Sequence, residues 1–128
     1  MRHLSTTSAR RSFFKVLLST ADAQAAMMTL KPGQSTSDEP VNEHPRCEQW
    51  VLVLGGTGKA IAGKRRAALK PNSLLLIEKG EPHQITATGK SPLVTLNFYA
   101  PPAYTKKGDL KLLARVPTLA AALTPARR

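Results

Sequence analysis

The chain has few of the residues that mark several common protein classes. One of its 128 residues is a cysteine, Cys47, which excludes an intrachain disulfide framework and a zinc site built from cysteine alone. No apolar run approaches the roughly 20 residues that a membrane-spanning helix needs, so we expect no membrane partner. Aromatic residues make up only 5%, and 8 acidic residues stand against 19 basic ones, for a formal net charge of +11. This charge leaves nucleic acid or an anionic ligand open as a partner.

The scarce acidic residues are not evenly spread. Six of the eight fall in two short windows that also hold or adjoin two of the three histidines. The windows contain Asp38, Glu39, Glu43 and Glu48 around His44, and Glu78 and Glu81 before His83. The segregation predicts an acidic, histidine-bearing pocket on a basic body, and the alternative is a solvated surface that is rich in lysine.

Short apolar runs separated by glycine and proline turns predict strands along most of the chain. The expected strands are 13–20, 25–30, 48–54, 59–62, 65–69, 74–77, 83–88 and 93–99. Strands at this spacing are typical of an all-β antiparallel sandwich or barrel. We expect one barrel domain over residues 13–104, with flexible basic tails at 1–12 and 105–128.

Residues 9–15 resemble a twin-arginine export signal, because Arg10 and Arg11 precede two phenylalanines. The apolar stretch that follows is short for a signal core and is broken by Lys15. We therefore expect residues 13–20 to form a first strand of a cytoplasmic protein. A mature protein that begins after Ala26 would indicate export instead.

Two glycine-containing segments are expected to be turns. Residues 56–59 read Gly-Thr-Gly-Lys, but the full phosphate-loop pattern is missing, and Ala60 stands where a magnesium-binding Ser or Thr would be. These glycines are better explained as hairpin residues, and Gly63-Lys64 is a second tight-turn pair. A nucleotide site is not expected.

The strand at 48–54 and the loop before it carry the chemistry. In an extended segment alternate side chains share a face, so we expect residues 42, 44 and 48 to point the same way, with Trp50, Leu52 and Leu54 continuing inward. Imidazoles from His44 and His83 and the Glu48 carboxylate can bind a divalent cation, and the Asn42 carbonyl oxygen is a weak fourth ligand. The alternative is that both histidines are exposed loop residues beside acids.

At these residues the chain resembles the cupin superfamily, over about residues 13–102. The first cupin motif is similar to residues 42–48 followed by Gly55, and the second is similar to residues 78–83, with Gly80 three residues before the histidine. Segments 14–17, 30–33 and 98–102 resemble small single-domain bacterial cupins of the mannose-6-phosphate-isomerase-like group. The resemblance implies a double-stranded β-helix, the cupin jelly roll, with a metal ion inside the barrel mouth.

The resemblance also implies a ligand set. The positions that match cupin metal ligands are His44, Glu48, His83 and, with an amide in place of an imidazole, Asn42. Two further departures are Glu78 in the place of a proline and Ala87 in the place of an asparagine. The implied cofactor is one divalent ion, with iron, manganese, nickel and zinc as the candidates.

Two function classes follow, because the cupin fold hosts many activities. The first is a metal-dependent oxygenase or isomerase that acts on a small polar molecule, with Glu78 or Glu81 as a candidate general base. The second is non-catalytic binding or sensing of a small, sugar-like ligand. Nucleic-acid binding through residues 64–70 depends on charge alone and ranks last.

A homodimer is the expected assembly. If Trp50 and Leu52 fill the core, Val51 and Val53 must point outward, where a symmetry mate would bury them together with the strand at 13–18. The alternative is a monomer in which the strand at 13–20 covers that face.

Overall fold

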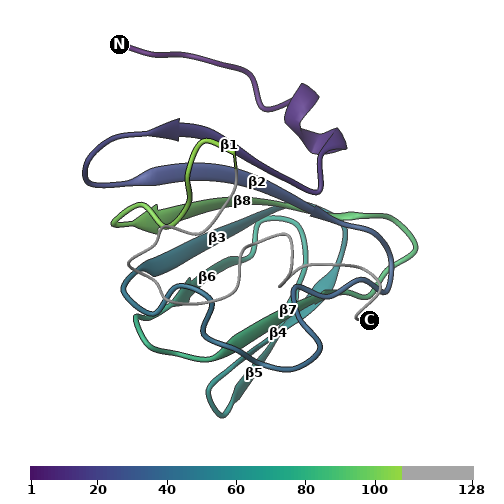
Figure 1. Ribbon diagram of the computed structural model, residues 1–128. Coiled ribbons are helices and arrows are strands. Elements are labelled where there is room, and N and C mark those ends of the chain that lie inside the picture. The colour runs from purple at the N-terminus through teal and green to yellow at the C-terminus, as the bar shows by residue number, and fades with distance from the viewer. Residues whose placement is uncertain (108–128) are drawn as a thin grey trace.

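The computed structural model describes residues 1–107 and contains eight strands and one short 3-10 helix within that range (Figure 1). The elements are η1 (Ser8–Arg11), β1 (Phe14–Ser19), β2 (Gln24–Leu30), β3 (Glu48–Gly55), β4 (Gly58–Ala62), β5 (Arg65–Leu69), β6 (Leu74–Ile77), β7 (His83–Ala87) and β8 (Leu93–Ala100). Every predicted strand is present, with boundaries that differ by at most one residue. The all-β expectation is confirmed.

The strands form two antiparallel sheets that lie one over the other (Figure 1). The larger sheet has the order β1-β2-β8-β3-β6, and the smaller has the order β5-β4-β7. Neighbours in the sheets that are distant in sequence, such as β2 with β8 and β4 with β7, give the jelly-roll winding of a double-stranded β-helix. The edge strands are β1 and β6 in the larger sheet and β5 and β7 in the smaller one.

The core lies between the sheets. The larger sheet contributes Val51, Val53 and Leu93, and the smaller contributes Ile85 and Leu69, each with 4% or less of its surface exposed. A second buried cluster gathers around Tyr99 and Tyr104 at one end of the barrel. Aliphatic packing therefore closes the middle of the barrel and aromatic packing closes that end.

The predicted orientation of β3 is wrong. Val51 and Val53 are fully buried, whereas Trp50 is 38% exposed. Because residues 50–54 are all apolar, alternation alone could not choose the inward face, and the structure places the β-branched residues inside. The dimer surface expected from Val51 and Val53 is therefore also wrong. The outer face carries Trp50 between Leu76 and Phe98 on the two neighbouring strands instead, all three partly exposed.

Two of the glycines predicted to lie in turns do so, at positive φ angles. Gly56 turns the chain from β3 to β4 at φ +79°, and a Cβ there would collide with the carbonyl of Pro92. Gly63, at φ +59°, turns the hairpin between β4 and β5. Both glycines serve the backbone, as expected for turns rather than a phosphate site.

The N-terminal segment reaches the larger sheet. Helix η1 lies against β2, and its Ala9 is 2% exposed. The flexibility predicted for residues 1–12 stays a prediction, and the predicted tail at 105–128 lies outside the described residues from 108 onward. Among the described residues, no helix is long and apolar enough to cross a membrane.

Candidate functional site: a buried histidine pair

The loop before β3 is fastened to β7, and this brings two histidines together. Val41 forms a bridge with His83, in which each backbone N–H donates to the other residue's carbonyl oxygen, at 3.1 and 2.9 Å. Three residues on, the His44 carbonyl accepts from the Cys47 N–H at 3.0 Å, which turns the chain into β3. The imidazole rings of His44 and His83 lie with their centroids 4.9 Å apart at an angle of 39°.

Each imidazole has one nitrogen held by a fixed acceptor. His44 Nε2 is 2.9 Å from Gln49 Oε1, and His83 Nδ1 is 2.9 Å from the carbonyl oxygen of Glu81. Both partners are acceptors, so these nitrogens carry the protons. The other nitrogen of each neutral ring then has a free lone pair. His44 Nδ1 is buried and has no hydrogen-bond partner among residues 1–107.

A chain of buried polar side chains fixes this tautomer. The Gln49 amide nitrogen donates to Asn97 Oδ1 at 2.9 Å, which directs its Oε1 toward His44. Asn97 Nδ2 donates in turn to Thr95 Oγ1 at 2.9 Å, and Thr95 Oγ1 donates to the carbonyl of Met28 at 3.1 Å. Since all these side chains are nearly inaccessible to water, each lost bond would leave an unsatisfied group inside the barrel.

Burial keeps both imidazoles neutral. Desolvation, with a further contribution from the neighbouring His83, lowers the pKa of His44 from 6.5 to about 4. Desolvation also lowers the pKa of His83, against the opposing effect of its hydrogen bond to Glu81. At neutral pH the pair therefore offers two uncharged nitrogen ligands.

Two tyrosines close the site above the histidines. The Tyr99 ring meets the His44 ring edge-on at a centroid distance of 5.1 Å, and the rings of Tyr99 and Tyr104 are 5.0 Å apart. The pKa of each phenol is raised, mainly by desolvation and also by the nearby Glu43. Because burial raises both pKa values, the two phenols stay protonated at neutral pH.

The space enclosed by these residues, which we call the histidine chamber, has a volume of about 10 Å³. Its polar lining consists of Thr36, Glu43, His44, Gln49, His83 and the two tyrosines. A volume of this size accommodates one water molecule or one ion and no organic molecule.

The structure brings together two of the four residues predicted as ligands. His44 and His83 line the histidine chamber, but neither Asn42 nor Glu48 does. Asn42 is half-buried, and Glu48 lies on the outer face of β3, where its Oε1 accepts from Trp50 Nε1 at 3.1 Å. Within residues 1–107, no three His, Cys, Asp or Glu side chains converge into a group that could hold a metal ion.

Sequence reasoning missed Gln49, Asn97 and the tyrosines. The shifted face of β3 replaces the Glu48 carboxylate with the Gln49 amide, because adjacent residues in a strand face opposite ways. The signal for Asn97 was available, since Thr95 and Asn97 are polar residues at alternate positions of an otherwise apolar strand. Polar residues at inward positions indicate a buried hydrogen-bond network.

Fold and site together define a double-stranded β-helix barrel with a pair of neutral imidazoles inside it. The chain belongs to the cupin family, whose cupin-domain profile matches residues 26–99.

Solved structures agree with this assignment. The chain is similar to BH2720 from Bacillus halodurans, at 25% identity and a TM-score of 0.71, with 77% of each chain covered. It is also similar to an uncharacterised double-stranded β-helix protein from Klebsiella pneumoniae, at 21% identity and a TM-score of 0.68, with 79% of this chain and 90% of that chain covered. An RmlC-like cupin from Desulfovibrio desulfuricans matches at 23% identity and a TM-score of 0.59, covering 70% and 81%. No curated protein sequence matches this chain at a significant level.

Proposed function

We propose that this protein is a metal-binding cupin whose His44 and His83 hold one divalent transition-metal ion. The observation that carries the proposal is the buried, unpartnered Nδ1 of His44 beside a second neutral imidazole, within residues 1–107. A buried nitrogen lone pair without a partner costs free energy, and coordination of a cation would remove that cost. Imidazole ligands suit iron, nickel and zinc, and also manganese in mixed nitrogen and oxygen sites.

The donor set supports a site in which the protein supplies two imidazole nitrogens. Glu48, the expected carboxylate ligand, faces away, and the Gln49 amide oxygen is already engaged by His44. Water or a small ligand would complete the coordination sphere. When bound, the ion would act as a Lewis acid toward an oxygen of that ligand. The tyrosine hydroxyl groups would supply hydrogen-bond donors beside it.

The size of the histidine chamber favours binding without turnover. An oxygenase or isomerase needs its substrate next to the metal ion, and a space of about 10 Å³ has no room for an organic substrate. The same limit applies to a sugar-like ligand, so what the histidine chamber supports is binding of the ion itself, without an organic substrate or ligand beside it.

Metal analysis of untagged protein tests the proposal. Protein stripped of metal, dialysed, and equilibrated with Zn²⁺, Ni²⁺, Mn²⁺ or Fe²⁺ should retain about one ion per chain with at least one of them. His44→Ala and His83→Ala should each abolish retention. His3→Ala is the matched control, because it removes the remaining histidine, which is exposed near the N-terminus, and should bind as the wild type does.

Circular dichroism of each variant separates loss of a ligand from loss of the fold. No bound metal in the wild-type protein would refute the proposal. So would equal loss in all three histidine variants, because it would indicate binding outside the histidine chamber.

The finer resemblance to the mannose-6-phosphate-isomerase-like group and the cytoplasmic location also stay proposals. The short apolar stretch after Arg11 supports the location, and so does the pairing of β1 with β2, since cleavage after Ala26 would remove all of β1. Sequencing of the N-terminus of the native protein would test it.

A further inference from the structure

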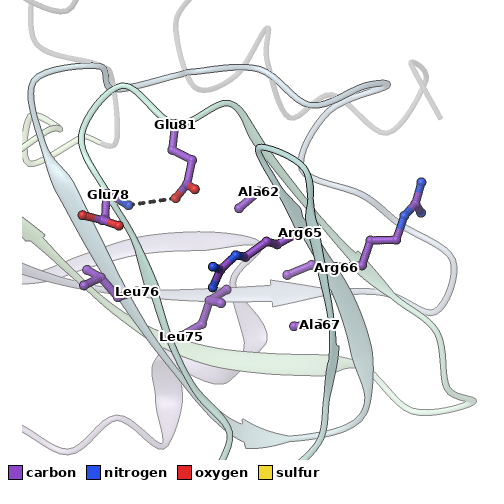
Figure 2. Close-up of a pocket in the computed structure, with 9 residues that line it drawn as sticks. Ala62, Arg65, Arg66, Ala67, Leu75, Leu76, Glu78 and Glu81 are labelled. Atoms are coloured by element: carbon purple, nitrogen blue, oxygen red, sulfur yellow. Dashed lines mark hydrogen bonds between the residues drawn. The ribbon is translucent and has the colours of Figure 1, made fainter.

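A second and much larger hollow opens at the seam between the two sheets. This seam cavity has a volume of about 600 Å³ and lies between the edge strands β5 and β6 (Figure 2). Its size is in the range of small-molecule sites. It shares no lining residue with the histidine chamber.

The seam cavity has an apolar floor and charged groups above it. Ala60, Ala62, Ala67 and Leu75 form the apolar part. Arg65 extends its guanidinium into the space, while the side chain of the next residue, Arg66, points away from it (Figure 2). The pairing of Ala62 with Arg65 across β4 and β5 explains the difference, because Arg65 shares the inward face and Arg66 does not.

Two carboxylates stand across the seam cavity from Arg65, on the turn between β6 and β7. Glu81 is held in place because its Oε1 accepts from the Glu78 backbone N–H at 3.1 Å, drawn as the dashed line in Figure 2. Among residues 1–107, neither the Arg65 guanidinium nor the Glu78 carboxylate has a hydrogen bond or an ion pair. Opposite charges thus face one space without neutralising each other directly.

The backbone fixes the two charged walls relative to each other. The Gly63 N–H in the β4–β5 hairpin donates to the carbonyl of Pro82, in the β6–β7 turn, at 2.9 Å. The Glu81 N–H donates to the Glu78 carbonyl at 3.1 Å and closes that turn. Ligand binding would therefore require no rearrangement of the backbone that carries the two walls.

We propose that the seam cavity binds a small zwitterion that carries a carboxylate at one end and a protonated amine at the other. The Arg65 guanidinium matches a carboxylate in charge and in its planar donor geometry. The carboxylates of Glu78 and Glu81 match an ammonium group, and the alanines and Leu75 match a short methylene chain between the two. A ligand with both charges satisfies both walls, whereas an ion of either sign satisfies one wall and is opposed by the other.

Calorimetric titration of the metal-stripped, dialysed protein tests this proposal independently of the metal site. The probes are 5-aminopentanoate, which has both charges, and pentanoate and pentylamine, which have one each. We expect 5-aminopentanoate to bind about tenfold more tightly than either matched probe. The proposal would be overturned if pentanoate bound as tightly as 5-aminopentanoate, or if no probe bound at concentrations up to about 10 mM.

Substitutions locate the binding in the seam cavity. Arg65→Met should weaken 5-aminopentanoate binding about tenfold, while Lys59→Met, which makes the same charge change at an exposed residue of β4 that does not line the seam cavity, should leave the affinity within about twofold. Glu81→Gln keeps an oxygen that can accept from the Glu78 N–H, so the turn should be preserved. Because it removes a negative charge, it should weaken binding of 5-aminopentanoate and leave binding of pentanoate no weaker. Equal effects of Arg65→Met and Lys59→Met would indicate attraction by the overall basic charge and would refute the site.

Discussion

The histidine chamber inside the barrel and the seam cavity at its edge differ in how their polar groups are satisfied. In the histidine chamber, buried side chains bond mainly to one another through the series His44, Gln49, Asn97 and Thr95. In the seam cavity, an arginine and two glutamates face a space of about 600 Å³, and among residues 1–107 the one side-chain hydrogen bond between them runs from the Glu78 backbone N–H to Glu81. A sealed site must satisfy most of its polar groups during folding, whereas an open one can leave charges for a ligand.

Strand position explains this difference. His83, Ala62 and Arg65 occupy one row across β7, β4 and β5, so two strand spacings, roughly 10 Å, separate the backbone positions of His83 and Arg65. The histidine end of the row is closed by Phe14 of β1 and by Tyr104. The arginine end meets the edge strands, where no further strand closes the seam among the described residues. Along this one row, His83 is therefore shielded from water and Arg65 is exposed to it.

The largest effect on this comparison should come from acid, which lowers stability through the histidine chamber. The folded-state pKa of His44, about 4, lies below its unfolded value of 6.5, so the unfolded chain takes up the proton first. The stability contributed by the neutral imidazole is complete above pH 6.5 and is lost as the pH falls toward 4. At about 1.4 kcal/mol per pH unit, His44 alone should cost the metal-free protein about 3 kcal/mol by pH 4, and His83 acts in the same direction.

Urea unfolding between pH 7 and pH 5 measures this loss before most carboxylates titrate. His44→Gln should flatten the pH dependence, since glutamine has no proton to gain, and His3→Ala should leave it unchanged. A wild-type stability that does not vary over this range would contradict the burial argument.

Removal of a buried amide should cost more than removal of an exposed charge. Asn97→Ala deletes the acceptor of the Gln49 amide and the donor to Thr95, so we expect a loss of about 2–3 kcal/mol in the free energy of unfolding. Arg65→Ala removes an exposed side chain without a partner among residues 1–107 and should change it by no more than about 0.5 kcal/mol. Comparable losses for the two variants, measured by urea unfolding, would show that the seam cavity is also part of the folding core.

The strands and turns could be predicted because their signals are local. Alternation, β-branched residues and turn glycines such as Gly56 and Gly63 depend on a few neighbouring residues, and each marked the correct segment. The inward face of β3 could not be predicted in this way. Both faces of residues 50–54 are apolar, so the choice depended on packing against the opposite sheet, which the sequence pattern of one strand does not contain.

That single choice decided how much of the site could be predicted. A shift of one residue moves Glu48 outward and Gln49 inward, so the carboxylate expected as a ligand became an amide that orients His44. The approach of His44 to His83 depends on the bridge between Val41 and β7, a long-range contact. The resemblance to cupins indicated the two histidines, but composition and spacing alone gave no sign of the seam cavity.

Restoration of the carboxylate should make the histidine chamber a stronger metal site. Gln49→Glu places an acidic oxygen beside His44, where charge attraction to a divalent ion should raise affinity about tenfold. Glu48→Gln is the matched control on the outer face and should leave affinity unchanged. Competition against a metal-binding dye measures both variants. Weaker metal binding after Glu48→Gln would indicate that Glu48 is a metal ligand, as expected from the sequence.

The smallest effect on the seam cavity should come from dimerisation through the outer face of the larger sheet. The expected homodimer stays a prediction, now through Trp50, Leu76 and Phe98, which form one exposed apolar row across three strands. A symmetry mate would bury this row against its own copy, and that burial must offset the repulsion between two chains of net charge +11. Leu76 also lines the seam cavity, so a partner on this row would narrow its opening.

Light scattering at micromolar concentration should therefore give the mass of a dimer, and Phe98→Asp should give that of a monomer with unchanged metal retention. Lys59→Asp, a charge change on an exposed residue of β4, is the control and should remain dimeric. If the dimer narrows the seam cavity, the monomeric variant should bind 5-aminopentanoate slightly faster, within about threefold, at similar affinity. A wild-type protein that stays monomeric at high concentration would contradict the predicted dimer. The opening of the seam cavity would then not be narrowed by a second copy.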